Sequence, residues 1–195
     1  MQFELTVDTS KFMRAVGRIP GAAKYARREI CDQLGKRFIA DFIRKAFAGR
    51  PRLKNRTGNL RRSFGHQIVE RQDGTQVLVR SNSQYAALQE HGGTVTPKRS
   101  KWLTIPVGPA LTAAGVARGP ARSFDLSFRP TKSPATALLV NAKGVVYFVL
   151  KKSAKVPPRL KMRASWAPFI GANITKIGNG VVSKMVRALN AGRAR

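Results

Sequence analysis

Three arginines surround a short segment whose residue types favour a tight turn, Arg56-Thr57-Gly58-Asn59-Leu60-Arg61-Arg62-Ser63. Gly58 permits a backbone conformation that other residues resist, Asn59 can hydrogen-bond its own backbone, and Leu60 can anchor the turn in a core. A guanidinium group pairs in bidentate fashion with carboxylate or phosphate. The segment therefore predicts a contact with an anionic partner or, as the plainer alternative, a loop-to-strand connection with incidental charge.

The turn closes a longer block of positive charge. Residues 44–62 contain eight cations and no acid: Arg44, Lys45, Arg50, Arg52, Lys54, Arg56, Arg61 and Arg62. Such a block is typical of a solvated or disordered loop, and also of contact with nucleic acid or with an acidic neighbour. Both interpretations remain open at this point.

A second group of polar residues and glycines runs from Tyr85 to Gly93. Tyr85 and Glu90 can form hydrogen bonds at the two ends of a one-turn helix. Gly92 and Gly93 then let the chain reverse into a strand, because glycine tolerates positive φ. We interpret this segment as a local determinant of the fold.

The residues that could support catalysis are few. His66 and His91 are the only histidines, Glu90 beside His91 could in principle serve acid/base chemistry, and the carboxylates close in sequence are Glu70, Asp73 and Glu90. Neither histidine lies in a motif with a nucleophile, and no phosphate-binding loop or zinc-protease motif is present. Since Cys31 is the single cysteine, a disulfide within the chain and a closed Cys/His zinc site are excluded. We therefore expect no enzyme activity, no cofactor and no metal; the enzymatic alternative is a small metal-dependent nuclease that uses Glu70, Asp73 and Glu90.

Composition limits the class of protein. The 195 residues include 37 Lys and Arg against 9 Asp and Glu, a net charge of +28, and 43% are hydrophobic. That apolar fraction supports a real core, and the charge predicts a polyanionic or charge-sharing partner. No run approaches the roughly 20 apolar residues that cross a membrane, and the N-terminus lacks a signal-peptide pattern.

Hydrophobic periodicity predicts the elements that would position these residues. The fold class is α+β: a mostly antiparallel sheet of about five or six strands packs against a long N-terminal helix and a C-terminal helix, with an extended arm. We expect one domain over residues 1–195, in which 108–136 is an insertion or arm that could reach an adjacent subunit. The predicted strands are 2–7, 67–70, 76–79, 94–96, 102–105, 137–140 and 145–150, and the helices are 11–47, 84–90 and a final helix from Trp166.

Taken in order, these motifs resemble the tail-completion, or neck, family of long-tailed bacteriophages. The resemblance rests on the Arg-Thr-Gly-x-Leu-Arg-x-Ser-like turn at 56–63, the Tyr-Ala-x-x-x-Glu-x-Gly segment at 85–92, and the Pro157-Pro158-Arg159 approach to the final helix. Length and basicity are also similar to those of the lambda minor tail protein Z group.

The resemblance implies a virion protein, made in the host cytoplasm, that forms a hexameric ring at the head-proximal end of the tail. Its partners would be a tail terminator or tail tube protein and a head connector or stopper protein, with sequence-independent contact to genomic DNA. The expected contact residues are Arg50, Arg52, Lys54, Arg56, Arg61 and Arg62; Thr57, Gly58, Asn59 and Leu60 would shape the turn, and Tyr85, Glu90, Gly92 and Gly93 the corner. The alternative is a stand-alone nucleic-acid-binding protein of ribosomal or nucleoid type.

Overall fold

The apolar stripe in the first part of the sequence forms one face of helix α2 (Pro20–Ala46). The structure, a computed structural model, describes residues 2–5, 20–49, 52–72 and 74–193. Pro20 begins the helix, where its missing N–H leaves no bond unmade. Ile30, Leu34, Phe38 and Phe42 recur every four residues and are at most 2% exposed, so this face of α2 is the centre of the core.

A three-stranded antiparallel sheet packs against α2. Its order is β1-β3-β2, from β1 (Gln2–Leu5), β2 (Phe64–Arg71) and β3 (Gly74–Ser81). The β2–β3 hairpin places Ile68 opposite Val77. Val77 and Val79 alternate with less buried neighbours and are fully buried, as expected for a strand with one face on a core.

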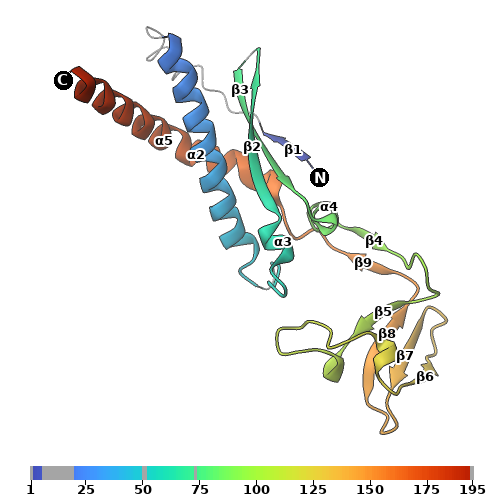
Figure 1. The fold of residues 1–195 in the computed structure, drawn as a ribbon. Helices are drawn as coiled ribbons and strands as arrows, with labels where there is room; N and C mark the ends of the chain where they lie inside the picture. The colour runs from blue at the N-terminus through green and yellow to red at the C-terminus, as the bar shows by residue number, and fades with distance from the viewer. Residues whose placement is uncertain (1, 6–19, 50–51, 73, 194–195) are drawn as a thin grey trace.

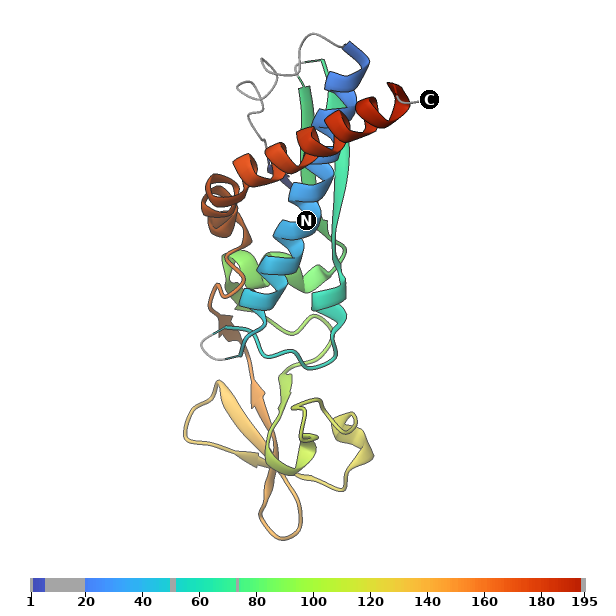
Figure 2. The same ribbon diagram turned by 90° about the vertical axis from the view of Figure 1, so that its left-hand side faces the viewer.

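Helix α5 (Met162–Arg193) crosses α2 and completes this core (Figure 2). The Trp166 ring meets the edge of Phe38 with centroids 4.7 Å apart, an arrangement favoured by aromatic quadrupoles. Ile177 and Val181 are also buried. Pro168 lies inside the helix, and Figure 2 shows the first turns running in a different direction from the rest, because proline removes one helical hydrogen bond.

Two extended segments lead away from this body to a second sheet (Figure 1). Helix α4 (Gln84–His91) is followed by β4 (Gly93–Val95), which pairs with β9 (Ala154–Val156) to form a two-stranded ribbon. Beyond the ribbon lies a four-stranded antiparallel sheet, the distal sheet, with order β5-β8-β7-β6. Its strands are β5 (Leu103–Pro106), β6 (Ser127–Pro130), β7 (Thr136–Val140) and β8 (Val146–Lys151).

Residues 108–136, expected as an insertion or arm, belong to this distal part. They form the 3-10 turns η1 (Gly108–Ala110) and η2 (Ala121–Ser123) and the edge strand β6. Between the two turns, Leu111 and Ala117 form an isolated bridge, and the Arg118 N–H donates to the Ala110 carbonyl at 2.9 Å. The tip of this loop, Gly115, lies against the Arg56 guanidinium, since a Cβ atom placed on Gly115 would be 3.5 Å from Nε.

The α+β class, the long N-terminal and C-terminal helices and the antiparallel strands are confirmed. The strands divide among three sheets, a division that the sequence did not indicate, and β6 and β9 were not predicted as strands. The part of the predicted first helix before Pro20 lies outside the described residues. Among the described helices, none is both long and apolar enough to cross a bilayer.

A polar cluster lies where α2 faces β2. The Asp32 carboxylate is 2.5 Å from Lys36 Nζ and 2.9 Å from His66 Nε2. Burial alone would raise the pKa of Asp32, but the hydrogen bonds and positive charges of Lys36 and His66 together hold this pKa below its ordinary value. A carboxyl with a lowered folded-state pKa stabilises the fold above its unfolded pKa and loses this contribution as the pH falls.

We predict that Asp32→Asn lowers the free energy of unfolding at pH 7 and that the gap to wild type narrows as the pH falls below about 4. In wild type, acid protonates Asp32 and removes its ionic contribution; the variant has no such contribution to lose. Urea unfolding of both proteins at pH 7 and pH 3 measures the two gaps. An equal difference in free energy of unfolding at both pH values would contradict a stabilising role for the ionised Asp32.

We also predict that Gly35→Ala destabilises the protein. A Cβ on Gly35 would lie 2.6 Å from His66 Cδ2, and such overpacking costs about 1–3 kcal/mol. Gly171→Ala on α5 is the matched control, because a Cβ there meets nothing within 4 Å and should be neutral or gain up to about 1 kcal/mol from helix propensity. Thermal unfolding measures both, and equal effects would argue against the close approach of His66.

Candidate assembly surface

The arginine-rich segment forms a turn closed by its own backbone. Gly58 has φ 77°, in the left-handed region, and precedes the short helix α3 (Asn59–Arg62). The Arg62 N–H donates to the Gly58 carbonyl at 2.9 Å, and the Asn59 N–H approaches Thr57 Oγ1 at 3.4 Å. The turn therefore combines a glycine in the left-handed region with polar groups that bond within the turn.

Arg62 folds back over this turn. Its Nη2 donates to the Thr57 carbonyl at 3.2 Å and to Asn59 Oδ1 at 3.1 Å. A Cβ on Gly58 would lie 2.8 Å from Arg62 Nη1, so the absence of a side chain at Gly58 makes room for the guanidinium. Arg62 thus helps to hold the turn, while its charge remains at the surface.

The turn is fixed to the sheet by serine. Ser63 Oγ donates to the Leu60 carbonyl at 2.7 Å and shares a 2.6 Å hydrogen bond with Ser81 Oγ at the end of β3. Leu60 is half-buried against the core. These contacts set the position of α3 relative to β2 and β3.

A pocket of about 680 Å³ opens between the end of α2 and α3. Apolar side chains and three guanidinium groups line it together. The lining residues are Ala40, Ile43 and Arg44 from the end of α2, Phe47 and Asn55 from the loop that follows, Arg61 and Arg62 from α3, and Phe64 from β2.

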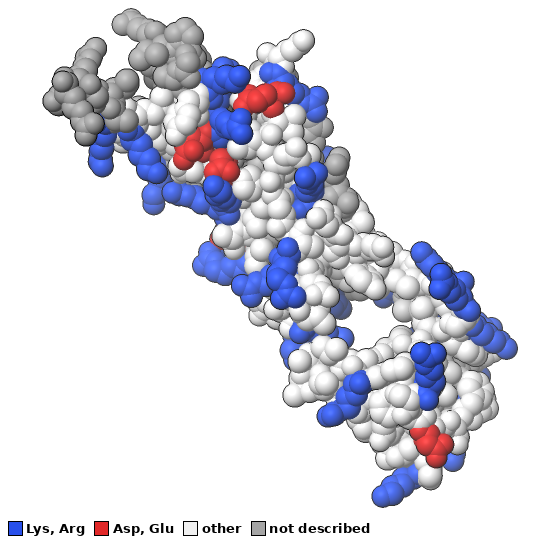
Figure 3. All heavy atoms as spheres, in the orientation of Figure 1, with Lys and Arg blue, Asp and Glu red and all other residues white. Residues whose placement is uncertain are grey.

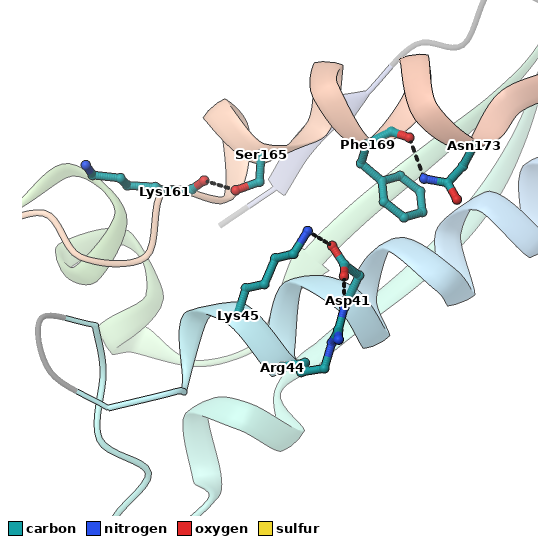
Figure 4. A network of polar contacts seen from close by, with 7 residues as sticks. All are labelled: Asp41, Arg44, Lys45, Lys161, Ser165, Phe169 and Asn173. Carbon is teal, nitrogen blue, oxygen red and sulfur yellow. Dashed lines mark hydrogen bonds and ion pairs between the residues drawn. The ribbon is translucent and has the colours of Figure 1, made fainter.

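One of the pocket arginines already has an acidic partner. Arg44 Nη2 and Lys45 Nζ are each 2.6 Å from the carboxylate of Asp41. Figure 4 shows this group on the side of α2 that faces α5, opposite Phe169 and Asn173. Burial alone would raise the pKa of Asp41, but the two cations together lower it. Asp41 therefore stays ionised and offsets part of the charge at this end of α2.

The loop from Phe47 to Gly58 presents the other predicted cations. Leu53 anchors it, because the Leu53 N–H donates to the Ala46 carbonyl at 3.0 Å. Arg52, Lys54 and Arg56 are exposed, and Arg50 lies outside the described residues. Within the described part of the chain, no carboxylate forms an ion pair with Arg52, Lys54, Arg56, Arg61 or Arg62. Figure 3 shows that blue cationic side chains far outnumber red acidic ones on the visible face.

The second predicted motif forms a corner held by Glu90. Its carboxylate accepts the Met162 N–H at 2.7 Å and the Arg163 N–H at 3.0 Å, in the first turn of α5. The Gln89 carbonyl accepts the N–H groups of Arg159 and Leu160, at 2.8 and 2.9 Å. Glu90 is 9% exposed, and a carboxylate suits the positive end of a helix dipole. Glu90 therefore joins α4 to the start of α5.

The glycines of the corner have different surroundings. Gly92 has φ 72°, and a Cβ there would lie 2.9 Å from both Pro158 Cδ and the Val156 carbonyl, so only glycine fits. Gly93 begins β4 opposite Val156. Tyr85 is 69% exposed, and its backbone N–H bonds to the N-cap residue Ser83.

Of the residues considered for catalysis, His66 and Glu90 form hydrogen bonds that join elements of the fold, and His91 is exposed. His66 bonds to Asp32, Glu90 bonds to α5, and His91 is exposed at the end of α4. Burial, with a smaller effect from Glu70, raises the pKa of the Cys31 thiol to about 11, which disfavours the thiolate. In the described part of the chain, no three His, Cys, Asp or Glu side chains are grouped so as to hold a metal ion.

Comparison with known proteins concerns the part of the chain that holds both motifs. Residues 10–92 match the model of a family described as "Bacteriophage HK97-gp10, putative tail-component". This is a family of bacteriophage tail components. The resemblance to a phage tail family is confirmed, because the segments 56–63 and 85–92 lie inside the matched range. The match supports a structural role in a phage tail, and so in the virion.

The match does not extend to the β4–β9 ribbon, the distal sheet or α5. No curated protein and no solved structure gives a significant match. The approach at 157–159, which contributed to the resemblance, lies outside the matched range. It nevertheless contacts the matched part directly, because the Arg159 N–H bonds to Gln89.

Sequence reasoning missed most of the pocket. Arg61 and Arg62 were predicted contact residues, whereas Ile43, Phe47 and Phe64 were assigned only to the core or left unassigned. Arg44 belonged to the cation block, and its spacing of three from Phe47, whose N–H still bonds to the Ile43 carbonyl, puts both on one side of the last turn. That spacing is the one feature of the sequence that could have indicated the pocket. It is informative only when α3 is known to lie beside the end of α2.

We predict that Glu90→Ala destabilises the protein by about 2–3 kcal/mol, because two buried or part-buried N–H groups lose a charged acceptor. Glu29→Ala on α2 is the control: Glu29 accepts one hydrogen bond, from Gln33 four residues away on the same helix, and its loss should cost below about 0.5 kcal/mol. Chemical unfolding followed by circular dichroism measures both. Equal costs would contradict a capping role for Glu90.

Proposed function

We propose that the chain is a non-enzymatic structural protein of the phage neck, which completes the head-proximal end of the tail and takes part in joining it to the head. The observation that carries this proposal is the tail-component match over residues 10–92, which includes both the arginine-rich turn and the Glu90 corner. In the virion the subunit would form a ring, with six copies as the expected number.

The exposed cations of this surface suit a subunit beside a DNA conduit. Arg52, Lys54, Arg56 and Arg61 are exposed, and phosphate contacts are independent of sequence and sensitive to salt. A passage that admits any genome requires contacts of that kind. We therefore assign these residues, with Arg50 and Arg62, to electrostatic contacts with DNA or with an acidic neighbouring ring.

Ring closure needs two different patches on each subunit, because a cyclic interface of more than two copies is heterologous. The proposed partners above and below the ring are a tail terminator or tail tube protein and a head connector or stopper protein. We further propose that residues 1–195 act as one unit in which 108–136 is an insertion. The proximity of Gly115 to the Arg56 side chain supports this, since it brings the insertion next to the matched part.

The alternative is a stand-alone, sequence-independent nucleic-acid-binding protein, which the net charge of +28 favours. The two proposals differ in what the protein needs for its function. A neck protein acts in a particle and forms a ring, whereas a nucleoid-type protein binds DNA tightly as a free subunit.

We predict that a nonsense mutation in the gene for this chain, in the phage that encodes it, yields DNA-filled heads and separate tails that do not join. Electron microscopy of lysates measures the fraction of joined particles. Supplying wild-type protein from a plasmid should restore joined particles and plaques. Normal particles in the absence of the chain would exclude the neck role.

Light scattering and DNA binding distinguish the alternative. A protein that stays monomeric at all concentrations and binds duplex DNA with nanomolar affinity at physiological salt would favour the nucleic-acid-binding reading. A ring, or ring formation induced by a partner, supports the neck role.

A further inference from the structure

The pocket between α2 and α3 is lined by two kinds of residue. Ile43, Phe47 and Phe64 supply apolar lining, and Arg44, Arg61 and Arg62 supply cationic lining. Ile43 and Phe47 are only partly buried, so the fold leaves part of this apolar area open to solvent. Such a site favours a ligand that has both a bulky apolar group and negative charge.

The three guanidinium groups are not equally available. Arg44 is paired with Asp41 at 2.6 Å, and Arg62 donates to Thr57 and Asn59 within its own turn. Arg61 is exposed and has no ion pair with any carboxylate in the described ranges. Arg61 is therefore the charge that an incoming carboxylate would meet first.

We propose that this pocket binds an acidic segment of another virion protein, which inserts a bulky apolar side chain between flanking carboxylates. The inference rests on the proposed assembly role and adds to it the surface and the chemistry of the partner. Arg61 pairs with a carboxylate in bidentate geometry, and the apolar side chain covers Ile43 and Phe47. Arg61 and the apolar pair Ile43 and Phe47 thus bind different parts of the same peptide.

Duplex DNA fits this pocket less well than such a peptide does. The phosphate backbone can pair with Arg61 but has no bulky apolar group to cover Ile43 and Phe47. Apolar area removed from water contributes about 25 cal/mol per Å², and a phosphate contact leaves that contribution unused. The exposed loop cations Arg52 and Lys54 lie outside the pocket lining and suit phosphate better.

A second copy of this chain is also a poor occupant. Among the acidic side chains whose surroundings are described, five are engaged within the subunit: Glu29, Asp32, Asp41, Glu70 and Glu90. Asp125 remains, but Arg122 and Arg129 flank it in sequence. Docking that segment would bring two further cations toward the three arginines of the pocket, so an acidic segment of another protein suits the pocket better.

Binding of labelled peptides to the purified full-length protein tests the proposal. The probe is a short peptide in which one phenylalanine is flanked on each side by pairs of aspartates. Two comparison peptides replace the phenylalanine by alanine, or the aspartates by asparagines. The protein variants are Arg61→Gln and, as a control with the same change in net charge, Arg129→Gln on the exposed edge strand β6. Fluorescence polarisation measures the affinities.

We expect saturable binding of the first peptide with a Kd below about 1 mM. Arg61→Gln should weaken it about fivefold to tenfold, as for the loss of a charge-assisted hydrogen bond, and Arg129→Gln by less than about twofold. Each comparison peptide should also bind at least about fivefold more weakly. No binding, or equal effects of the two variants, would overturn the proposal.

Two further outcomes would replace it by another explanation. If the alanine peptide binds as well as the phenylalanine peptide, the site responds to charge alone. If duplex DNA binds, the acidic peptide does not, and Arg61→Gln weakens DNA binding, the pocket is a nucleic-acid contact. Because these measurements use the free subunit, the pocket proposal can be overturned while the nonsense-mutation test supports the neck role. Equally, peptide binding can be observed while that test excludes the neck role.

Discussion

The hydrogen bonds that the Glu90 carboxylate accepts determine how α5 is placed relative to α4. Helix α5 begins just after Lys161, whose φ of 54° is unusual for a residue with a side chain, and Glu90 on α4 supplies the acceptor for the N–H groups of Met162 and Arg163. Buried N–H groups without acceptors are costly. The start of α5, and with it the position of Trp166 on Phe38, is therefore set by α4.

This corner also explains how the body accommodates the distal sheet. The chain leaves at Gly92 and returns at Pro158, and these two residues are in close contact. Residues 93–157, which form the ribbon and the distal sheet, therefore leave the body and return to it at the same position. Loops and sheets inserted at such a place can vary without disturbing the core on either side. The family match ends at this corner, at residue 92, in keeping with that division.

Much of the fold could be predicted because its signals are local. The four-residue recurrence from Ile30 to Phe42 and the alternation beside Gly74 follow from helix and strand periods, and both hairpins were found at the predicted positions. The capping of α5 by Glu90 joins residues 72 positions apart, and no periodicity indicates such a pair. The pocket was missed for the same reason, since α2, α3 and β2 meet there only in the folded chain. β6 was missed because 108–136 has no regular pattern.

The exposed cations of α3 and of the loop before it have a consequence for the free subunit. Arg52, Lys54, Arg56 and Arg61 are exposed like charges close in sequence, and dissolved ions screen repulsion between such charges over about 10 Å at 0.1 M ionic strength. Salt therefore stabilises the isolated fold at this end while it weakens every contact that the same charges make with an anionic neighbour. Higher ionic strength therefore favours the free subunit and disfavours the assembled one. At low salt, association with an anionic neighbour neutralises charges whose repulsion is unscreened in the free subunit.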